Sequence, residues 1–417
     1  MIKTEYGHFS APFFQEKFDN GLNVLFFPRK SKLNCAYLYL PCGSFPHEEQ
    51  IEGVKTPYGS AYLLQHLVLT EARKKEFMSL GTLATSSLDY SYTLFRLSSF
   101  GDIFPSVSKL LDVFLKQDFK EEEIEAFKKE NQESLLSLEN DPLYLTSRGL
   151  LENLYETSPI RMGIQPLFKD VNVIHRSALR NHVLKYTAID KMTLFLGGNM
   201  EVKEVEEKVS ALKVNRTGSL LCKPIVYQEM YDRVKCPYTE KHVRGIDSDY
   251  LSFGIKFAKR QQLYESFGQL LFEFYEILIP ALFTENQEFL KGLVEVGARL
   301  VDSKIHEAGE DGCLILTFRC KGSTSLVKFL TDYVSKLERR LTAKDFKAVV
   351  NDYYAKGLVS LSLPNTALDE FSRIYADNLS YTGILNALPK MGFNTFRNFL
   401  SKMDHFPKAA FFLGKVL

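Results

Sequence analysis

The sequence is poor in cysteine, and its cysteines are not arranged in pairs. Only six occur in 417 residues, with no C-x-x-C spacing among them: Cys35, Cys42, Cys222, Cys236, Cys313 and Cys320. A chain of this length can bury a core large enough to need no disulfide staples. We therefore expect reduced thiols rather than a disulfide framework or a structural zinc site.

The sequence also lacks an excess of charge and a long apolar run. Its 52 Lys and Arg residues nearly balance 51 Asp and Glu, so the net charge is +1 and no global field attracts nucleic acid or an anionic membrane. No apolar run approaches the roughly 20 residues of a membrane span. The N-terminal residues 1–6 resemble neither a secretory signal nor a transit peptide. We expect a cytoplasmic protein with no nucleic-acid or membrane partner.

The composition and an internal echo predict a folded chain built from two similar halves. Hydrophobic residues make up 45% of the sequence and charged residues 25%, as in ordinary globular proteins. Residues 190–197 recur in outline at 407–414, and 137–140 at 362–365, with similar separations along the chain. Such self-similarity indicates a duplicated unit.

The order of expected elements supports the duplication. In the first half, periodicity predicts strands followed by a run of helices: strands at 21–27, 35–40 and 82–97, and helices at 60–77, 105–115, 120–138 and 143–155. The second half repeats this order, and its last helix opens with a capping-box pattern at Thr342 and Asp345: strands at 250–257 and 313–320, and helices at 262–279, 325–339 and 342–358. Strands with helices packed on one face predict an α+β fold. We place an N-terminal domain at 1–205, a linker at 206–240 and a C-terminal domain at 241–417.

The segment 58–67 contains the outline of a zinc peptidase motif without its chemistry. Inverted zincins carry H-x-x-E-H, with two imidazoles one helical turn apart and a glutamate that serves as general base. Here Tyr62 stands at the first histidine position, Gln65 at the glutamate position, and only His66 is retained. A phenol with a pKa near 10 stays protonated, and an amide cannot take a proton from water, which costs roughly 100- to 10,000-fold in rate.

Motifs in order along the first half resemble those of the M16 family, which includes pitrilysin and the mitochondrial processing peptidases. They are Asn20–Val24, Gly43-Ser44, the 62–66 helix, Asp141-Pro142 and Glu152–Tyr155. The closest likeness is to the bacterial processing-peptidase-like branch. The resemblance implies two similar α+β halves that face one another around a peptide chamber. It also implies that the chain works in a pair, because some members of this branch combine a catalytic with a non-catalytic subunit.

The resemblance leaves the third zinc ligand of the family open in this sequence. In M16 enzymes that ligand is a glutamate on a later helix. Counting back from Asp141-Pro142 without a gap places Ser134 there, whereas a shift of one residue places Glu133 there. One residue turns a helical side chain by about 100°, so both cannot face the same site. We interpret His66 as a hydrogen-bonded histidine in the former cavity rather than as a remaining ligand.

The resemblance also implies a peptide-binding edge strand, at which substrate backbone extends the sheet. The corresponding residues are Leu83, Ala84, Thr85 and Ser86, with Leu83 at the position of the family's asparagine. An ordinary edge strand is the alternative. In the second half, Val294 replaces the substrate-gripping arginine, no tyrosine follows, and Arg299 is expected at the surface.

Three functions remain open from these residues. The first is a non-catalytic M16 homologue without zinc, which forms a hetero- or homodimer with an M16 homologue or binds peptide. The second is a zinc metalloendopeptidase with an unorthodox ligand set that includes His66 and Glu133. The third is a self-associating peptide-binding scaffold.

Overall fold

Two sheets, each in its own unit, organise the chain. The computed structural model describes residues 1–4, 12–44, 50–51, 54–116, 119–214, 227–375 and 380–416. Unit 1 consists of Met1–Glu133, Ile164–Ile225 and Lys356–Asn386, and unit 2 of Ser134–Gly163, Val226–Ala355 and Ala387–Leu417. Each unit therefore draws on both halves of the sequence. Residues 215–226 of the expected linker lie outside the described residues.

Unit 1 is built on a seven-stranded sheet in the order β1-β2-β3-β9-β4-β8-β7. The β3–β9 pair is parallel, and the other pairs are antiparallel. β7 ends the sheet, and no other strand within the described ranges pairs with its second edge. The strands are β1 (Ile2–Thr4), β2 (Phe13–Lys17), β3 (Asn23–Pro28), β4 (Asn34–Leu40), β7 (Thr82–Leu88), β8 (Thr93–Ser99) and β9 (Thr193–Gly198), beside a separate pair, β5 (Gln50–Ile51) and β6 (Val54–Lys55).

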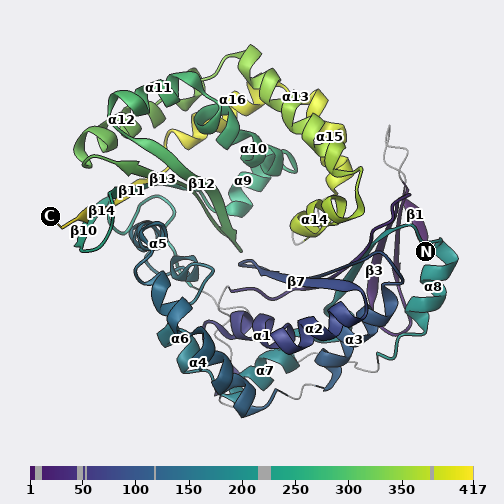
Figure 1. The fold of residues 1–417 in the computed structure, drawn as a ribbon. Helices are drawn as coiled ribbons and strands as arrows, with labels where there is room; N and C mark the ends of the chain where they lie inside the picture. Colours follow the sequence, from purple (N-terminus) through teal and green to yellow (C-terminus); the bar gives the residue numbers. More distant parts are fainter. Residues whose placement is uncertain are drawn as a thin grey trace. The chain divides into compact units, whose positions relative to one another are not determined.

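Helices from the first half cover one face of this sheet, and Figure 1 shows α1 and α2 running along β7. The helices are α1 (Ser60–Val68), α2 (Glu71–Ser79), α3 (Phe104–Lys116), α4 (Glu121–Leu138), α6 (Phe168–Asn172), α7 (Arg176–Tyr186), η2 (Ile189–Lys191) and α8 (Val202–Ser210). The single helix expected at 60–77 is two helices. Thr70 adopts an extended backbone and accepts a hydrogen bond from the Arg73 N–H, so it ends one helix and caps the next.

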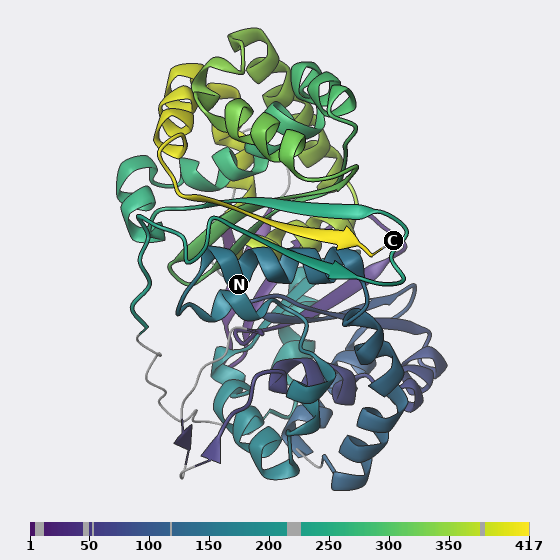
Figure 2. The ribbon, with the colours of Figure 1, turned by 90° about the vertical axis from the view of Figure 1, so that its left-hand side faces the viewer.

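Unit 2 repeats the arrangement with a five-stranded sheet in the order β10-β14-β11-β13-β12. Figure 2 shows the yellow strand β14 between its two green neighbours. The strands are β10 (Tyr238–Val243), β11 (Asp249–Lys256), β12 (Arg299–Ala308), β13 (Asp311–Cys320) and β14 (Lys408–Lys415). The β10–β14 pair is parallel and the rest antiparallel, which matches β3-β9-β4-β8-β7 strand for strand. The predicted α+β fold of two similar, mainly antiparallel halves is confirmed.

The helices of the second half follow the predicted order with one interruption. The helix expected at 262–279 breaks at Gly268, which has φ +57°, a conformation that glycine adopts readily. Thr342 and Asp345 form the expected capping interaction, with the Asp345 N–H donating to the Thr342 hydroxyl at 3.2 Å. The elements are α9 (Arg260–Phe267), α10 (Leu270–Ile279), η3 (Pro280–Thr284), α11 (Gln287–Glu295), α12 (Thr324–Val334), η4 (Leu337–Arg339), α13 (Ala343–Ser360), α14 (Pro364–Tyr375), α15 (Tyr381–Ala387), η5 (Leu388–Lys390) and α16 (Phe393–Met403).

The two halves of the sequence exchange helical segments between the units. α5 (Pro142–Leu154) and the short η1 (Pro159–Met162) come from the first half, yet α5 packs on β14 and β11 of unit 2. There the Asn153 side-chain amide donates to the Ala410 carbonyl at 2.8 Å. Conversely, α14 comes from the second half and packs on β4 and β9 of unit 1, where Tyr375 accepts a hydrogen bond from Asn23 at 2.7 Å. Each sheet therefore buries its second face only when both halves are present.

Gly149 on α5 provides a test of the exchanged packing. A Cβ atom at this position would lie 2.4 Å from ring atoms of Phe411 on β14, closer than any ordinary contact. We expect Gly149→Ala to lower the free energy of unfolding by about 1–3 kcal/mol, although alanine favours helices. The matched control is Gly383→Ala on α15, where the nearest atom is 3.4 Å away. Denaturant unfolding should show the control as stable as the parent; equal losses in both variants would contradict the packing.

A buried ion pair joins β11 of unit 2 to the segment around Glu229, which precedes β10 in the chain. The Lys256 ammonium group of β11 lies 2.6 Å from Glu229, and both side chains are 1% exposed. Lys256 also donates to the carbonyls of Met230 and Arg233 at 2.7 and 3.1 Å. Burial acts to raise the pKa of Glu229, but hydrogen bonds from Lys256 and from two backbone N–H groups outweigh it and lower the pKa to about 2. The Glu229 carboxylate is therefore ionised at neutral pH, and it accepts hydrogen bonds from Lys256 and from the backbone.

Within the described part of the chain, no single helix is both long and apolar enough to cross a membrane. One pair of helices, Arg260–Phe267 with Leu270–Thr284, is bent by 104° and meets the length and composition criteria together.

Candidate functional site

The helix α1 places the two ring-bearing motif residues on one face. Tyr62 and His66 are four residues apart, which brings side chains together on a helix surface, and their ring centroids are 4.5 Å apart. Phe127 from α4 completes the group, with its ring 5.1 Å from His66 and 6.3 Å from Tyr62. Tyr62 and His66 are partly exposed, while Phe127 is buried. We call these three side chains the aromatic cluster.

The aromatic cluster is electrically neutral at physiological pH. Burial lowers the pKa of His66 below its ordinary value of 6.5, and the nearby positive charge of Lys74 lowers it further. Burial raises the pKa of Tyr62 above 10. His66 is therefore a neutral imidazole beside two aromatic rings, with no hydrogen bond to any described residue. We expected a hydrogen-bonded histidine at this position, but the described contacts of His66 are with the rings of Tyr62 and Phe127.

Gln65 connects the motif helix to the end strand of the sheet. Its side chain is buried, and its amide Nε2 lies 3.1 Å from the Ser86 hydroxyl on β7. The residue at the general-base position of the family is therefore a hydrogen-bond donor to the expected peptide-binding strand. An amide in this role holds two elements together but cannot accept a proton from water.

The two candidates for the third ligand both lie near the end of α4 and both are exposed. Helical geometry separates them. Ser134 follows Phe127 by seven residues, so it lies within about 20° of the same face, whereas Glu133 is rotated by about 120° from it. The ungapped alignment thus places a serine, not the glutamate, on the face of α4 that carries Phe127.

The residues present do not fit a catalytic zinc ion. Such a site needs about three ligands from His, Cys, Asp or Glu, with an open position for water. The motif helix supplies one imidazole, and that imidazole lies against the rings of Tyr62 and Phe127. Within the described ranges, no group of three such side chains lies close enough together to hold a metal ion.

The predicted peptide-binding residues lie on the end strand β7. Leu83 is 63% exposed and Thr85 is exposed, whereas Ala84 between them is buried, as the alternation of a strand requires. Ser86 is partly exposed and accepts the hydrogen bond from Gln65. Among the described strands, β7 pairs with β8 alone, so its other edge is where a further strand could be added.

A charged pair that the sequence analysis did not anticipate lies beside β7. Arg96 on β8 donates to Asp369 on α14 at 2.8 Å and to the Ser87 hydroxyl on β7 at 2.7 Å. Its guanidinium also lies 5.5 Å from the Tyr37 ring centroid. Asp369 is 273 residues away in sequence, so no local pattern could pair the two. Phe127 was also not identified from the sequence. Its spacing of seven residues from Ser134, which places both on one face of a helix, is the signal that could have identified it.

In the second half, the residues at the substrate-gripping positions are at the surface. Val294, at the arginine position, is 76% exposed near the end of α11. Arg299 is exposed at the start of β12, opposite Arg319 of β13, as expected for a surface residue.

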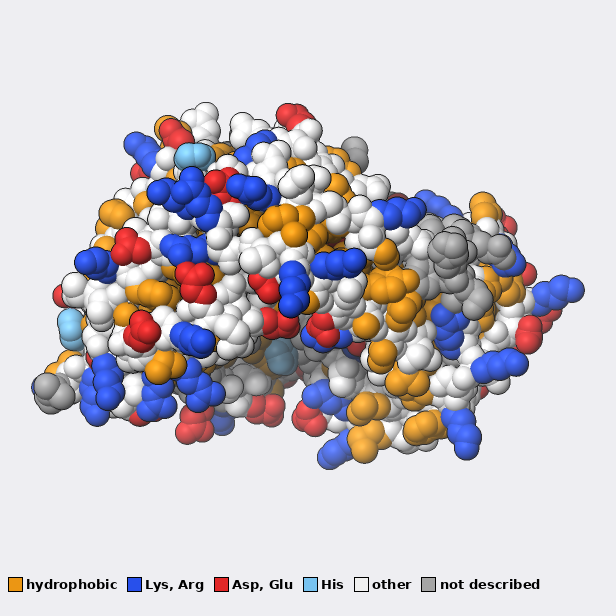
Figure 3. Space-filling view, turned by 90° about the horizontal axis from the view of Figure 1, so that it is seen from above, with side chains coloured by type: hydrophobic (Ala, Val, Ile, Leu, Met, Phe, Trp, Pro, Cys, Tyr) orange, Lys and Arg blue, Asp and Glu red, His pale blue; other side chains and the backbone are white. Residues whose placement is uncertain are grey.

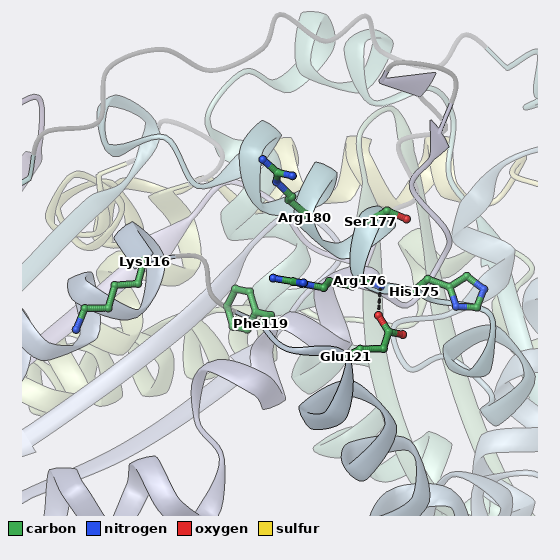
Figure 4. A pocket seen from close by; sticks show the side chains of 7 residues that line it. All are labelled: Lys116, Phe119, Glu121, His175, Arg176, Ser177 and Arg180. Atoms are coloured by element: carbon green, nitrogen blue, oxygen red, sulfur yellow. Dashed lines mark hydrogen bonds between the residues drawn. The ribbon is translucent and has the colours of Figure 1, made fainter.

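One hollow in unit 1 is separate from the motif helix and from β7. It has a volume of about 990 Å³ and lies where the end of α3 meets the starts of α4 and α7. Figure 4 shows its lining: Lys116, Phe119, Glu121, His175, Arg176, Ser177 and Arg180. The Arg176 backbone N–H donates to Glu121 at 3.2 Å, which joins α7 to α4. Elsewhere charge is mixed: on the face drawn in Figure 3, side chains of both signs are interspersed with small apolar patches.

Known proteins with a similar sequence or fold point to one family. No family model matches the sequence. The uncharacterized zinc protease YmfH of Bacillus subtilis (strain 168) is 24% identical over 219 residues, which span 50% of this chain and 51% of YmfH. The match thus covers about half the length of that relative.

Two solved structures cover nearly the whole chain. An M16-like peptidase from Alicyclobacillus acidocaldarius has a TM-score of 0.86 at 16% identity, over 99% of this chain and 100% of that one. A peptidase M16 inactive domain from Pseudomonas fluorescens has a TM-score of 0.77 at 15% identity, over 97% and 98% of the two chains. The fold is that of M16 peptidases. The chain is thus similar in fold to M16-like peptidases and, over half of its length, similar in sequence to a protein named a zinc protease.

Proposed function

We propose that this chain is a non-catalytic M16 homologue that holds an extended peptide along β7 and works as a dimer with an M16 homologue. The observation that carries the proposal is the hydrogen bond from Gln65 to Ser86. Through this hydrogen bond, the residue at the general-base position of the family contacts β7, the strand proposed to bind peptide. Adding a strand needs only main-chain groups, so this edge retains its capacity to bind although the residues of hydrolysis are replaced.

The chemistry of the motif supports the non-catalytic part of the proposal. Even with a metal bound, Gln65 could not activate water, and Tyr62 is a phenol whose pKa burial raises further. Glu133 lies on a different face of α4 from Phe127, so it does not make up for the lost ligand. The inactive M16 domain from Pseudomonas fluorescens, similar over nearly its full length, is a precedent for this fold without activity.

YmfH, which is named a zinc protease, favours a second candidate function. This is a zinc metalloendopeptidase whose ligand set includes His66 and Glu133. It requires the His66 ring to leave Phe127 and Glu133 to turn inward. Metal content and its dependence on His66 separate the two candidates.

We expect the purified protein to contain less than one zinc ion per chain and to cleave no peptide, because a single motif imidazole cannot form a three-ligand site. Zinc is measured by inductively coupled plasma mass spectrometry on the parent and on His66→Ala. His175→Ala, at an exposed histidine outside the motif, is the matched control. A chelator should leave the melting temperature unchanged, since no metal contributes to the folded state.

Stoichiometric zinc that disappears in His66→Ala but stays in His175→Ala would establish the second candidate instead. Dimer formation is tested separately, by co-expression with an M16 homologue that carries an intact H-x-x-E-H motif. A stable complex supports the partner role. Self-association alone would favour the peptide-binding scaffold.

A further inference from the structure

A small cavity lies at the N-terminal end of the motif helix α1, within unit 1. Its volume is about 20 Å³, and one particle the size of a water molecule needs roughly 10–15 Å³. The cavity therefore has room for a single such particle. Side chains from α1, from α7 and from the segments before β5 and after β6 contribute to its wall, among them Ser44, Thr56, Ser60, Ala61, His182 and Tyr186.

Two hydroxyl groups that line this cavity have no hydrogen-bond partner among the described residues. They are the Oγ atom of Ser44 and the Oγ1 atom of Thr56, both out of contact with solvent. Ser44 is 5% exposed and Thr56 is 9% exposed. A buried hydroxyl without a partner costs free energy, and native proteins satisfy nearly all such groups with protein atoms or with a bound species. Two of them in one small cavity indicate a species that both can contact.

The backbone fixes Ser44 in the wall of the cavity. A Cβ atom at Gly43 would lie 2.2 and 2.3 Å from the carbonyl oxygens of Asp89 and Tyr90, so only glycine allows this close approach. The adjacent Ser44 N–H donates to the Asp89 carbonyl at 2.9 Å. The Gly43-Ser44 motif thus has a structural consequence, because it positions one of the two unpartnered hydroxyls.

The electrostatic surroundings of the cavity favour an anion. Gly59 at the N-cap of α1 offers no side-chain cap, and the first N–H groups of a helix give its N-terminal end a positive potential. Lys185 of α7 is fully buried, and its Nζ lies 4.7 Å from the ring centroid of Tyr186, which lines the cavity. None of the described lining residues is acidic. A cation in this position would therefore meet repulsion.

We propose that this cavity is a binding site for one monatomic anion such as chloride, with the hydroxyls of Ser44 and Thr56 as donors. The volume excludes phosphate, sulfate and a peptide carboxylate, each of which contains several heavy atoms. The Ser60 hydroxyl already donates to the Pro57 carbonyl at 2.8 Å, so it is not a third donor. The anion connects the segments that carry Ser44 and Thr56 to the start of α1. This inference does not depend on the proposed function.

Thermal unfolding, followed by circular dichroism, tests whether chloride binds. Sodium chloride replaces sodium gluconate, whose anion is too large for the cavity, at a constant salt concentration. A ligand of the folded state stabilises it by mass action, so we expect the Tm of the parent to rise by about 3 °C or more from zero to about 200 mM chloride. The concentration dependence of this rise gives an apparent affinity.

Variants that remove one donor each assign the effect to the cavity. Ser44→Ala and Thr56→Val should each weaken the apparent chloride affinity by about tenfold, as loss of one hydrogen bond to a charged group predicts. Ser108→Ala, at an exposed serine of α3, is the matched control and should respond to chloride as the parent does. Because all proteins are compared in the same salts, general salt effects on stability cancel.

Crystals of the parent protein soaked in sodium bromide locate the site directly, because bromide scatters X-rays anomalously. We expect an anomalous peak in the cavity, within hydrogen-bond distance of the Ser44 and Thr56 hydroxyls. This measurement needs no variant, so it decides the question even if Thr56→Val does not fold. No peak in the cavity would mean that it holds water alone, which overturns the proposal. A peak without a chloride response, or with an equal response in Ser44→Ala and the parent, would mean an adventitious ion only and would overturn it as well.

Discussion

Replacing Lys256 by methionine is expected to lower the free energy of unfolding of unit 2 by about 3–5 kcal/mol. The substitution keeps most of the side-chain volume but removes the ammonium group that lies 2.6 Å from Glu229. The Glu229 carboxylate would then stay buried with uncharged donors alone. These are the Glu156, Thr157 and Ser158 N–H groups at 3.3, 2.8 and 2.9 Å and the Thr157 hydroxyl at 3.0 Å. Two carbonyl groups would also lose their donor. Removing one member of a buried pair costs far more than the pair contributes as a whole.

The matched control is Lys304→Met. Lys304 pairs with Asp302 at 3.0 Å on β12, but these side chains are about 40% exposed, so we expect a loss below about 1 kcal/mol. Urea unfolding is followed by far-ultraviolet circular dichroism, because the chain has no tryptophan to report by fluorescence. A double variant, Lys256→Met with Glu229→Leu, should recover much of the loss. Equal stability of the two lysine variants would show that the pair is not buried.

Restoring the zinc motif is expected to produce the second large effect. Tyr62 and His66 already lie one turn apart with their rings in contact, so Tyr62→His with Gln65→Glu recreates two imidazoles and a base. We expect this double variant to bind zinc weakly. Adding Ser134→Glu should strengthen binding by about tenfold or more, equivalent to about 1.4 kcal/mol, because Ser134 shares a face of α4 with Phe127.

Zinc affinity is measured by competition with a chromogenic chelator. Glu133→Ala in the double variant is the matched control, and we expect it to change the affinity little. If Glu133→Ala abolished binding while Ser134→Glu added nothing, the ungapped alignment of α4 would be wrong by one residue. Peptide cleavage need not return in the triple variant, because Val294 and the missing tyrosine leave the substrate without its usual hold.

Elements whose signals are local were predictable from the sequence. The apolar segment predicted as a strand at 21–27 corresponds to β3, and the one at 313–320 corresponds to most of β13. The capping pair at Thr342 also formed as predicted. The sequence pattern did not predict β12. This strand lies at the edge of its sheet with mixed burial, so its apolar and polar residues do not alternate clearly.

The degenerate motif was equally readable, since loss of ligand chemistry depends only on which residues occupy positions 62, 65 and 66. The contacts that these residues make in place of metal ligation could not be predicted from the sequence. Phe127 contacts His66 although the two are 61 residues apart in sequence, and Gln65 donates a hydrogen bond to Ser86, 21 residues away. These partners depend on how α1, α4 and β7 pack, which no spacing within one element encodes.

By itself, the sequence determined the duplicated α+β plan, the order of most helices and strands, and the absence of a complete H-x-x-E-H triad, because each follows from short-range periodicity or residue identity. Only the tertiary structure decided that α5 and α14 are exchanged between the units. It also placed the Lys256–Glu229 pair in unit 2 and joined Tyr62, His66 and Phe127 into one cluster. The physical reason is that these features minimise exposed apolar surface and unpaired charge over the whole chain, and their energies arise between residues far apart in sequence.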